Sequence, residues 1–187
     1  KTMLDANQLR KGTTFILDGK LYQVLEYQHH KPGRGNAIIR TKLRDLRSGT
    51  ILRRNFLDND RFEEAPVERR TFQYLYSDGE FYYFMDTETY DQTRILHDLI
   101  GEKAGYLKES KELTLVMLGN EPIDIELPPT VELEVTEAEM AVVGDTATGA
   151  QKAVTCETGL SVDVPLFVEV GDVIRVDTRS GEYVTRV

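Results

Sequence analysis

The sequence predicts an all-β protein built from three small β-barrels in series. Two Asp-Gly pairs, Asp18-Gly19 and Asp78-Gly79, each separate two runs of apolar and aromatic residues. Asp-Gly tolerates the positive φ angles of a type I′ turn, so each pair predicts a β-hairpin. Ser48-Gly49 and Ser180-Gly181 mark further turns. Short strands between frequent turns are typical of barrels rather than of βαβ units.

The predicted strands are short runs rich in Val, Ile, Thr, Tyr and Phe. They cover residues 14–17, 21–25, 37–46, 50–56, 72–76, 81–85, 112–118, 131–135, 172–176 and 182–187. One helix is predicted over residues 93–100, because its apolar residues fall on one helical face. Gly101 suits the C-cap of that helix, and a second short turn is expected over residues 102–107.

Two proline-containing segments divide the chain. Glu63-Glu64-Ala65-Pro66 ends a basic region, and Leu127-Pro128-Pro129 cannot continue a strand ladder because proline has no N–H. We therefore expect domains over residues 1–64, 65–127 and 128–187. Each piece is near the lower size limit for an independent core, and closure into a barrel suits that size by removing exposed edges.

The charge is distributed unevenly along the chain. The formal net charge is −9, but residues 1–62 carry +7, residues 63–127 carry −9 and residues 128–187 carry −7. Phosphate binding needs Lys and Arg, so the total argues against a nucleic-acid partner whereas the basic first region favours one. We expect no membrane span and no signal peptide. The single cysteine, Cys156, favours a reducing cytoplasmic setting.

A basic hairpin tip is the strongest candidate for function. Residues 29–36 read His-His-Lys-Pro-Gly-Arg-Gly-Asn and lie between two predicted strands. Pro32 and Gly33 favour a turn, and Gly35 frees the backbone a second time. Arg34, flanked by two glycines, suits bidentate pairing with a phosphate or stacking on a base.

The strand after the tip adds further cations, largely at alternating positions and so on one face: Arg40, Lys42, Arg44 and Arg47. The alternative interpretation is a solvated surface loop whose charges only confer solubility.

Other residue patterns carry less weight. His29 and His30 are adjacent on a predicted strand and point to opposite faces, so they make a poor metal pair. Cys156 is expected at a buried strand position. The aromatic run of residues 81–84 could stack on bases, although it could equally fill two faces of a barrel. No spacing specifies a catalytic set, and we expect no metal, no cofactor and no enzymatic activity.

Several segments along the chain together carry a family resemblance. The first is Lys31-Pro32-Gly33-Arg34-Gly35-Asn36-Ala37, followed by residues 40–46. Residues 76–81 and 84–85 belong to it in the middle of the chain, and residues 144–146, 152–154, 159, 164–168, 171–172 and 176–183 towards the C-terminus. Through these segments the whole chain resembles the bacterial elongation factor P family, which is related to initiation factor five A.

The resemblance implies an SH3/KOW-like barrel followed by two OB-folds, in a bent, tRNA-like shape. It implies a cytoplasmic, monomeric, non-enzymatic factor that binds the 70S ribosome between the peptidyl and exit tRNA sites. There it would relieve stalling at consecutive prolines. The implied partners are peptidyl tRNA (especially prolyl), ribosomal RNA and an exit-site ribosomal protein.

The resemblance also implies roles for particular residues. The tip would reach the peptidyl-transferase centre and position the acceptor end of the tRNA: Lys31, Pro32, Gly33, Arg34, Gly35 and Asn36. Arg40, Lys42 and Arg44 would contact RNA along the arm. Gly144, Asp145 and Thr146 would form a loop near the exit-site codon on the small subunit. Tyr183 and Arg186 would make C-terminal contacts with tRNA or the ribosome.

Position 34 departs from many members of the family, which carry a modified lysine there. Arg34 excludes lysylation at this position. Some relatives attach rhamnose to an arginine within a different loop sequence. An enzyme that modifies Arg34, an unmodified Arg34 and a lysine-type modification at Lys31 all remain open.

Three alternative functions also remain open. One is a paralogue that resembles elongation factor P in fold. Another is a general OB-fold RNA-binding protein, but residues 63–187 have a net charge of −16, which counts against this function. The third is a carbohydrate- or nucleotide-processing enzyme in the aromatic middle segment.

Overall fold

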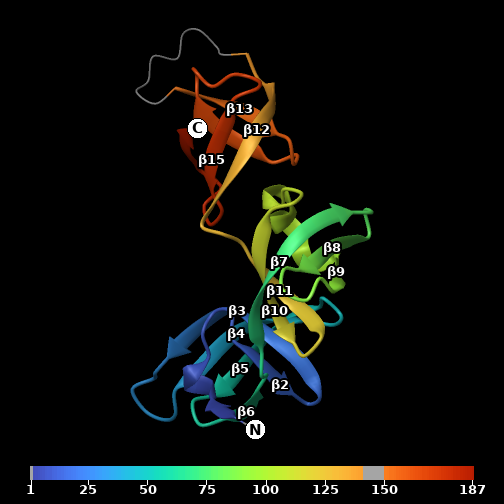
Figure 1. Cartoon of the computed structure of the whole chain (residues 1–187). Helices are drawn as coiled ribbons and strands as arrows, with labels where there is room; N and C mark the ends of the chain where they lie inside the picture. The colour runs from blue at the N-terminus through green and yellow to red at the C-terminus, as the bar shows by residue number, and fades with distance from the viewer. Residues whose placement is uncertain (1, 141–149) are drawn as a thin grey trace. The chain divides into compact units, whose positions relative to one another are not determined.

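The strands of the protein form three sheets (Figure 1). The structure, a computed structural model, describes residues 2–140 and 150–187. Strands make up most of the regular structure in this part of the chain, which confirms the all-β prediction. None of the helices described there is long and apolar enough to cross a membrane.

The first sheet has six strands in the order β1-β6-β2-β3-β4-β5. Their bounds are β1 Met3–Asp5, β2 Thr14–Leu17, β3 Lys20–His30, β4 Ile38–Asp45, β5 Ile51–Leu57 and β6 Arg61–Glu64, and a short 3-10 turn covers Ala6–Gln8. Four aromatic rings fill its core, with centroids 4.7–6.3 Å apart: Phe15, Tyr22, Phe56 and Phe62. Rings packed at such distances contribute more than their buried area alone.

The second and third sheets have five strands each. The second has the order β11-β10-β7-β8-β9, with β7 Glu68–Ser77, β8 Phe81–Asp86, β9 Gln92–Leu96, β10 Glu112–Leu118 and β11 Glu121–Glu126. The third has the order β14-β13-β12-β15-β16, with β12 Thr130–Ala138, β13 Gln151–Cys156, β14 Ser161–Pro165, β15 Val173–Asp177 and β16 Tyr183–Arg186. Its core holds fully buried aliphatic residues such as Leu133, Val164 and Ile174.

By its contacts the chain divides into two compact units. One contains residues 1–69 and 116–123, and the other contains residues 70–115 and 124–187. Residues 116–123 join the first unit because Val116 and Ile123 pack with Leu21, Leu46 and Ala65 in a buried cluster. The expected division into three domains stays a prediction.

The helix predicted over residues 93–100 is wrong over its first half. Gln92–Leu96 is strand β9, and the helix α1 covers only His97–Ile100. Thr93 and Ile95 face inward, opposite Phe84 and Tyr82 of β8, which is the period-two pattern of a strand. Gly101, with φ +55°, follows the helix as expected, and a 3-10 turn then covers Gly101–Tyr106.

One type of hairpin turn occurs in all three sheets. It begins with the last residue of a strand: Asp45 of β4, Asp86 of β8 and Asp177 of β15. In each case the aspartate carboxylate accepts hydrogen bonds from the backbone N–H groups two and three residues later, at 2.7–3.2 Å. The N–H group four residues later donates to the aspartate carbonyl at 2.8–2.9 Å.

The fifth residue of each turn adopts a positive φ angle. It is Gly49 (+74°) in the first sheet, Gly181 (+74°) in the third and Tyr90 (+63°) in the second. Glycine adopts this conformation without a Cβ penalty, whereas a side-chain-bearing residue is strained by about 1–2 kcal/mol. The middle turn therefore carries a residue that its backbone disfavours.

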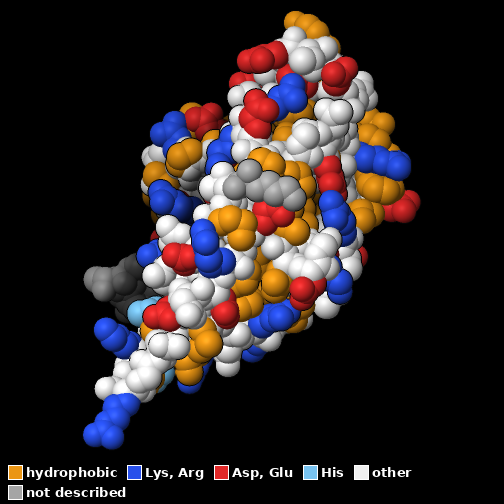
Figure 2. Space-filling model, turned by 90° about the horizontal axis from the view of Figure 1, so that it is seen from below, with side chains coloured by type: hydrophobic (Ala, Val, Ile, Leu, Met, Phe, Trp, Pro, Cys, Tyr) orange, Lys and Arg blue, Asp and Glu red, His pale blue; other side chains and the backbone are white. Residues whose placement is uncertain are grey.

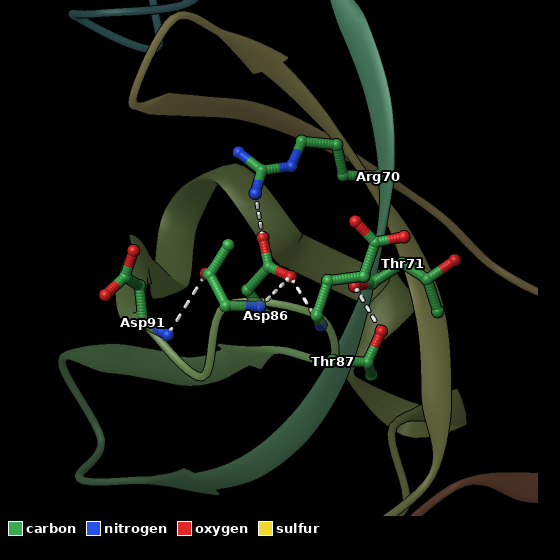
Figure 3. Close-up of polar contacts among 7 residues, drawn as sticks. Arg70, Thr71, Asp86, Thr87 and Asp91 are labelled. Atoms are coloured by element: carbon green, nitrogen blue, oxygen red, sulfur yellow. Dashed lines mark hydrogen bonds and ion pairs between the residues drawn. The ribbon is translucent and has the colours of Figure 1, made fainter.

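The turn at Asp86 has an additional partner (Figure 3). The Arg70 guanidinium forms an ion pair with the Asp86 carboxylate, whose residue is 2 % exposed. Hydrogen bonds from the backbone, first that of Glu88 and then that of Thr89, together with Arg70, hold the pKa of Asp86 below its usual value. A carboxylate anchored in this way ties the β8–β9 turn to β7.

The other two turn aspartates also have lowered pKa values. Burial on its own would raise the pKa of Asp45, but the N–H groups of Arg47 and Ser48 outweigh it. At Asp177 the N–H groups of Arg179 and Ser180 lower the pKa directly. In all three turns, the charged carboxylate is the form that the fold stabilises.

We expect opposite effects from two substitutions at the fifth turn position. Gly49→Ala forces a Cβ into the left-handed region and should destabilise the protein by about 1–2 kcal/mol. Tyr90→Gly relieves the same strain and should be neutral or stabilising by up to about 1 kcal/mol. Urea unfolding followed by circular dichroism measures both changes. Destabilisation by Tyr90→Gly as large as that by Gly49→Ala would contradict the strain argument.

We also expect acid to destabilise the protein through these turns. A carboxylate whose pKa is lower when folded contributes stability above its unfolded pKa, about 3.9, and loses that contribution as the pH falls through the folded pKa. The thermal midpoint should therefore fall on acidification below about pH 4. Replacing Asp45, Asp86 and Asp177 with Asn should flatten this acid dependence. An equally steep dependence in the triple variant would show that other carboxylates control it.

Candidate nucleic-acid interface

The basic hairpin is formed by β3 and β4. The two strands pair up to His30, which lies opposite Ile38, so β3 continues well beyond the predicted residues 21–25. Beyond Val24, β3 has left β2 and forms the edge of the sheet. Its last five residues, 26–30, are all exposed over about 16 Å of strand.

A third strand supports this hairpin. β5 runs beside β4 as far as the pair Ile38–Leu57, and the Asp58 N–H donates to the Ala37 carbonyl at 3.1 Å. The buried side chain of Ile39 lies opposite Phe56. The arm is therefore a three-stranded extension of the sheet, and residues 31–37 make up the connection at its end.

Most of the tip is exposed, as the sequence predicted. Lys31, Gly33, Arg34, Gly35 and Asn36 are exposed, and Pro32 is half-buried. Figure 2 shows a narrow projection that ends in Lys and Arg side chains. Gly35 has φ +98°, so its backbone needs glycine even though a Cβ there would meet nothing within 4 Å. A Cβ at Gly33 would also meet open space, so both neighbours of Arg34 leave its guanidinium accessible.

The cations along β4 share the outward face, as the alternation predicted. Arg40 is exposed, and Lys42 and Arg44 are half-buried, while the alternate residues Thr41, Leu43 and Asp45 are buried. The Lys42 ammonium nitrogen lies 3.9 Å from a carboxylate oxygen of Glu26 on β3. Arg47 lies beyond the end of β4, in the Asp45 turn, and its Nε lies 3.6 Å from Glu121. The continuous face therefore ends at Arg44.

Arg53 on β5 belongs to the same face, and the sequence analysis missed it. It lies directly opposite Lys42, so the two side chains point the same way. Its neighbour Arg54 lies opposite the buried Thr41, with its guanidinium 5.6 Å from the Phe56 ring and 4.0 Å from Asp18. Finding Arg53 from sequence requires the β4–β5 register, which the Asp45 turn sets.

The remaining predicted site residues lie in the third sheet or outside the described residues. Tyr183 is half-buried and packs against the core of that sheet. The Arg186 guanidinium lies 4.9 Å from the Phe167 ring and 3.5 Å from the Asp172 carboxylate. Gly144, Asp145 and Thr146 lie outside the described residues.

The weaker candidates occupy ordinary positions. His29 and His30 lie on β3 opposite Ile39 and Ile38. Cys156 is buried on β13, as predicted, and burial raises the pKa of its thiol to about 11. Within the described residues, no group of three His, Cys, Asp or Glu side chains could hold a metal ion.

Three family models match successive parts of the chain. They are the elongation factor P KOW-like domain over residues 5–62, the elongation factor P OB domain over residues 67–125 and the elongation factor P C-terminal domain over residues 131–186. These matches identify a KOW-like domain followed by an OB domain.

Curated relatives match along essentially the whole chain. Proteins named elongation factor P from Caldanaerobacter subterraneus and Clostridium perfringens are each 48% identical over 185 residues, which covers 99% of this chain and 100% of theirs. The protein of the same name from Moorella thermoacetica is 46% identical over 184 residues, with 98% and 100% covered.

A solved structure resembles part of the chain. The eukaryotic translation initiation factor 5A from Methanococcus jannaschii matches with a TM-score of 0.50 and 19% identity, covering 68% of this chain and 92% of that one. At this identity the likeness supports the fold alone.

Arg53 and Arg54 offer a matched test of the basic face. If the outward face contacts phosphates, Arg53→Gln should reduce the slope of log affinity against log salt by about one unit for an RNA hairpin. Arg54→Gln, on the opposite face, should leave the slope unchanged. Fluorescence anisotropy at several KCl concentrations measures both, and equal effects of the two substitutions would rule out this face as the contact.

Proposed function

The chain belongs to the elongation factor P family of translation factors, and from this premise we propose that it binds the 70S ribosome between the peptidyl and exit tRNA sites. There it stimulates peptide-bond formation and relieves stalling at consecutive prolines. Relatives named elongation factor P that match over 98–99% of the chain support this proposal. The factor would act in the cytoplasm, as a monomer.

The observation that carries the proposal is the exposed Arg34 at the end of a supported arm. Its neighbours Gly33 and Gly35 have no side chains, and Arg34 forms no ion pair with the described residues around it. A guanidinium with both sides open can donate two parallel hydrogen bonds to one phosphate. The arm thus suits a narrow cleft with RNA walls.

Arg34 would act by positioning the tRNA rather than by chemistry. Proline has a fixed φ angle, which limits the geometries from which its nitrogen can attack. Ordering the acceptor end of the peptidyl tRNA would reduce the entropy that must be lost on reaching the transition state. Lys31 and Asn36 would add sugar-phosphate contacts beside Arg34. The bond-forming chemistry stays with ribosomal RNA, so the protein itself is no enzyme.

The outward face of β4 and β5 would hold the arm against RNA. Arg40, Lys42, Arg44 and Arg53 point the same way, and their charge would attract the phosphate backbone irrespective of base sequence. The rest of the chain, residues 63–187, carries −16 and would limit indiscriminate RNA binding. Affinity would then depend on the shape of the site as well as on charge.

The division of labour follows the three expected domains. Residues 1–64 would contact the tRNA acceptor end, and residues 65–127 would form the central OB-fold. In residues 128–187, Gly144, Asp145 and Thr146 would lie near the exit-site codon. Tyr183 and Arg186 would contact tRNA or the ribosome, with an exit-site ribosomal protein as a further partner.

We expect Arg34→Ala to lower the synthesis of a triproline reporter in a reconstituted translation system by roughly tenfold, the effect of losing a hydrogen bond to a charged group. Arg34→Lys should retain part of the activity, because lysine keeps the charge but loses the planar fork. A reporter without consecutive prolines should respond little to either substitution.

Two controls accompany this experiment. Arg54→Gln should retain full activity because Arg54 faces away from the basic surface. Intact-mass measurement of the native protein tests our proposal that Arg34 acts unmodified, and a rhamnose-sized increment on the tip peptide would identify a modifying enzyme as a partner. Full activity of Arg34→Ala would contradict the positioning role.

A further inference from the structure

The outer face of strands β7, β8 and β9 carries an exposed aromatic cluster. Tyr76, Tyr83 and Arg94 lie side by side across the three strands, since Tyr76 pairs with Tyr83 and Tyr83 pairs with Arg94. The rings of Tyr76 and Tyr83 stack at 4.6 Å with an angle of 16° between their planes. The Arg94 guanidinium lies 4.1 Å from the centroid of the Phe81 ring. We call these four residues the planar row.

The planar row is not part of a core. Tyr74, Tyr82 and Phe84 point inward and are buried, whereas Tyr76 is 48% exposed and Phe81 and Tyr83 are half-buried. The sequence analysis left open whether these aromatic residues stack on bases or fill the barrel. The alternation along β8 divides them between the two faces.

Hydrogen bonds fix the orientation of Tyr83. Its hydroxyl donates to Asp78 Oδ2 at 2.7 Å, and this bond raises the pKa of Tyr83. Asp78 Oδ1 accepts the N–H groups of Glu80 and Phe81 at 2.9 and 2.7 Å. The Asp78 carboxylate is therefore engaged by three donors, and Tyr83 is held in place before any ligand arrives.

The charge around the planar row differs from the net charge of residues 63–127. Residues 63–127 carry −9. Asp78 and Glu80 carry exposed carboxylates in the turn between β7 and β8, but the outward-facing residues on the strands are neutral apart from Arg94: Gln73, Tyr76, Phe81, Tyr83, Met85, Gln92 and Leu96. Among the described residues, Arg94 forms no ion pair with a carboxylate, and its guanidinium lies over the Phe81 ring. The face therefore offers π surfaces and one available positive charge.

We propose that the planar row binds an unpaired base of single-stranded RNA, with the base stacked on Tyr76 and the adjoining phosphate paired with Arg94. The face spans the first three strands of the OB domain, and OB-folds bind oligonucleotides on the face of their second and third strands. A base–aromatic stack with an arginine beside it is how proteins hold single strands without reading sequence. A cationic peptide fits less well, because Arg94 would repel it. This contact is separate from the arm and does not depend on the role of Arg34.

The test compares two fluorescently labelled RNA hexamers of equal charge, r(A)6 and an abasic hexamer, by anisotropy with the full-length protein. Stacking should make r(A)6 bind at least about fivefold more tightly than the abasic strand. Tyr76→Leu should bring this ratio close to one, and Tyr76→Phe should preserve it because the ring remains. Tyr90→Leu, at an exposed tyrosine outside the planar row, serves as the matched control.

Each other outcome overturns the proposal. A ratio near one in the native protein would mean that only phosphates are bound, as expected for the basic arm alone. A ratio that persists in Tyr76→Leu would place the base elsewhere. If Tyr76→Leu weakens the binding of a hexaarginine peptide but not that of RNA, the face binds a basic protein instead. If a thermal melt shows that Tyr76→Leu is unfolded, Arg94→Gln replaces it as the test. An unchanged affinity of Arg94→Gln for r(A)6 would refute the contact.

Discussion

The aspartate turn that recurs in all three sheets is the contact on which the arrangement of side chains depends. One carboxylate engages two backbone N–H groups, and the loop then closes on a residue with positive φ. Because side chains alternate along a strand, a shift of one residue would reverse every side chain of the next strand. The Asp45 turn thus places Arg53 beside Lys42 and leaves Arg54 on the opposite face. The Asp86 turn does the same for β9 and directs Arg94 outward beside Tyr83.

Strands with two different faces allow a small barrel to combine a core with a binding surface. β4 contributes Ile39 and Leu43 to the aromatic core of the first sheet, and Arg40 and Lys42 to its outer face. β8 contributes Phe84 inward and Tyr83 outward in the same manner. The core of the first sheet contains only about ten buried residues, so few substitutions can be accommodated on its inner face. The outer face has no such restriction, so charge and aromatic content can vary there without changing the fold.

Two of the strands predicted from the sequence agree with the structure at both ends. Residues 14–17 and 112–118 were located to the residue, and the tip at residues 31–36 lies where the glycines and proline indicated. The prediction failed at residues 92–96, because Ile95 and Leu96 from a strand and Leu99 and Ile100 from a short helix together imitate a single helical face. Arg53 was missed for a different reason: membership of a face depends on register between strands, which composition and periodicity within one strand do not contain.

The third strand behind the hairpin gives the tip a particular mechanical character. A two-stranded ribbon of this length would bend and twist, whereas β5 holds β4 along its whole length and its core-facing residues anchor both. The freedom that remains is concentrated in the six residues 31–36, two of which are glycine. Conformational entropy lost on binding is then confined to this short connection. The tip can therefore adapt its conformation to what it contacts, while the supported strands keep the length of the arm constant.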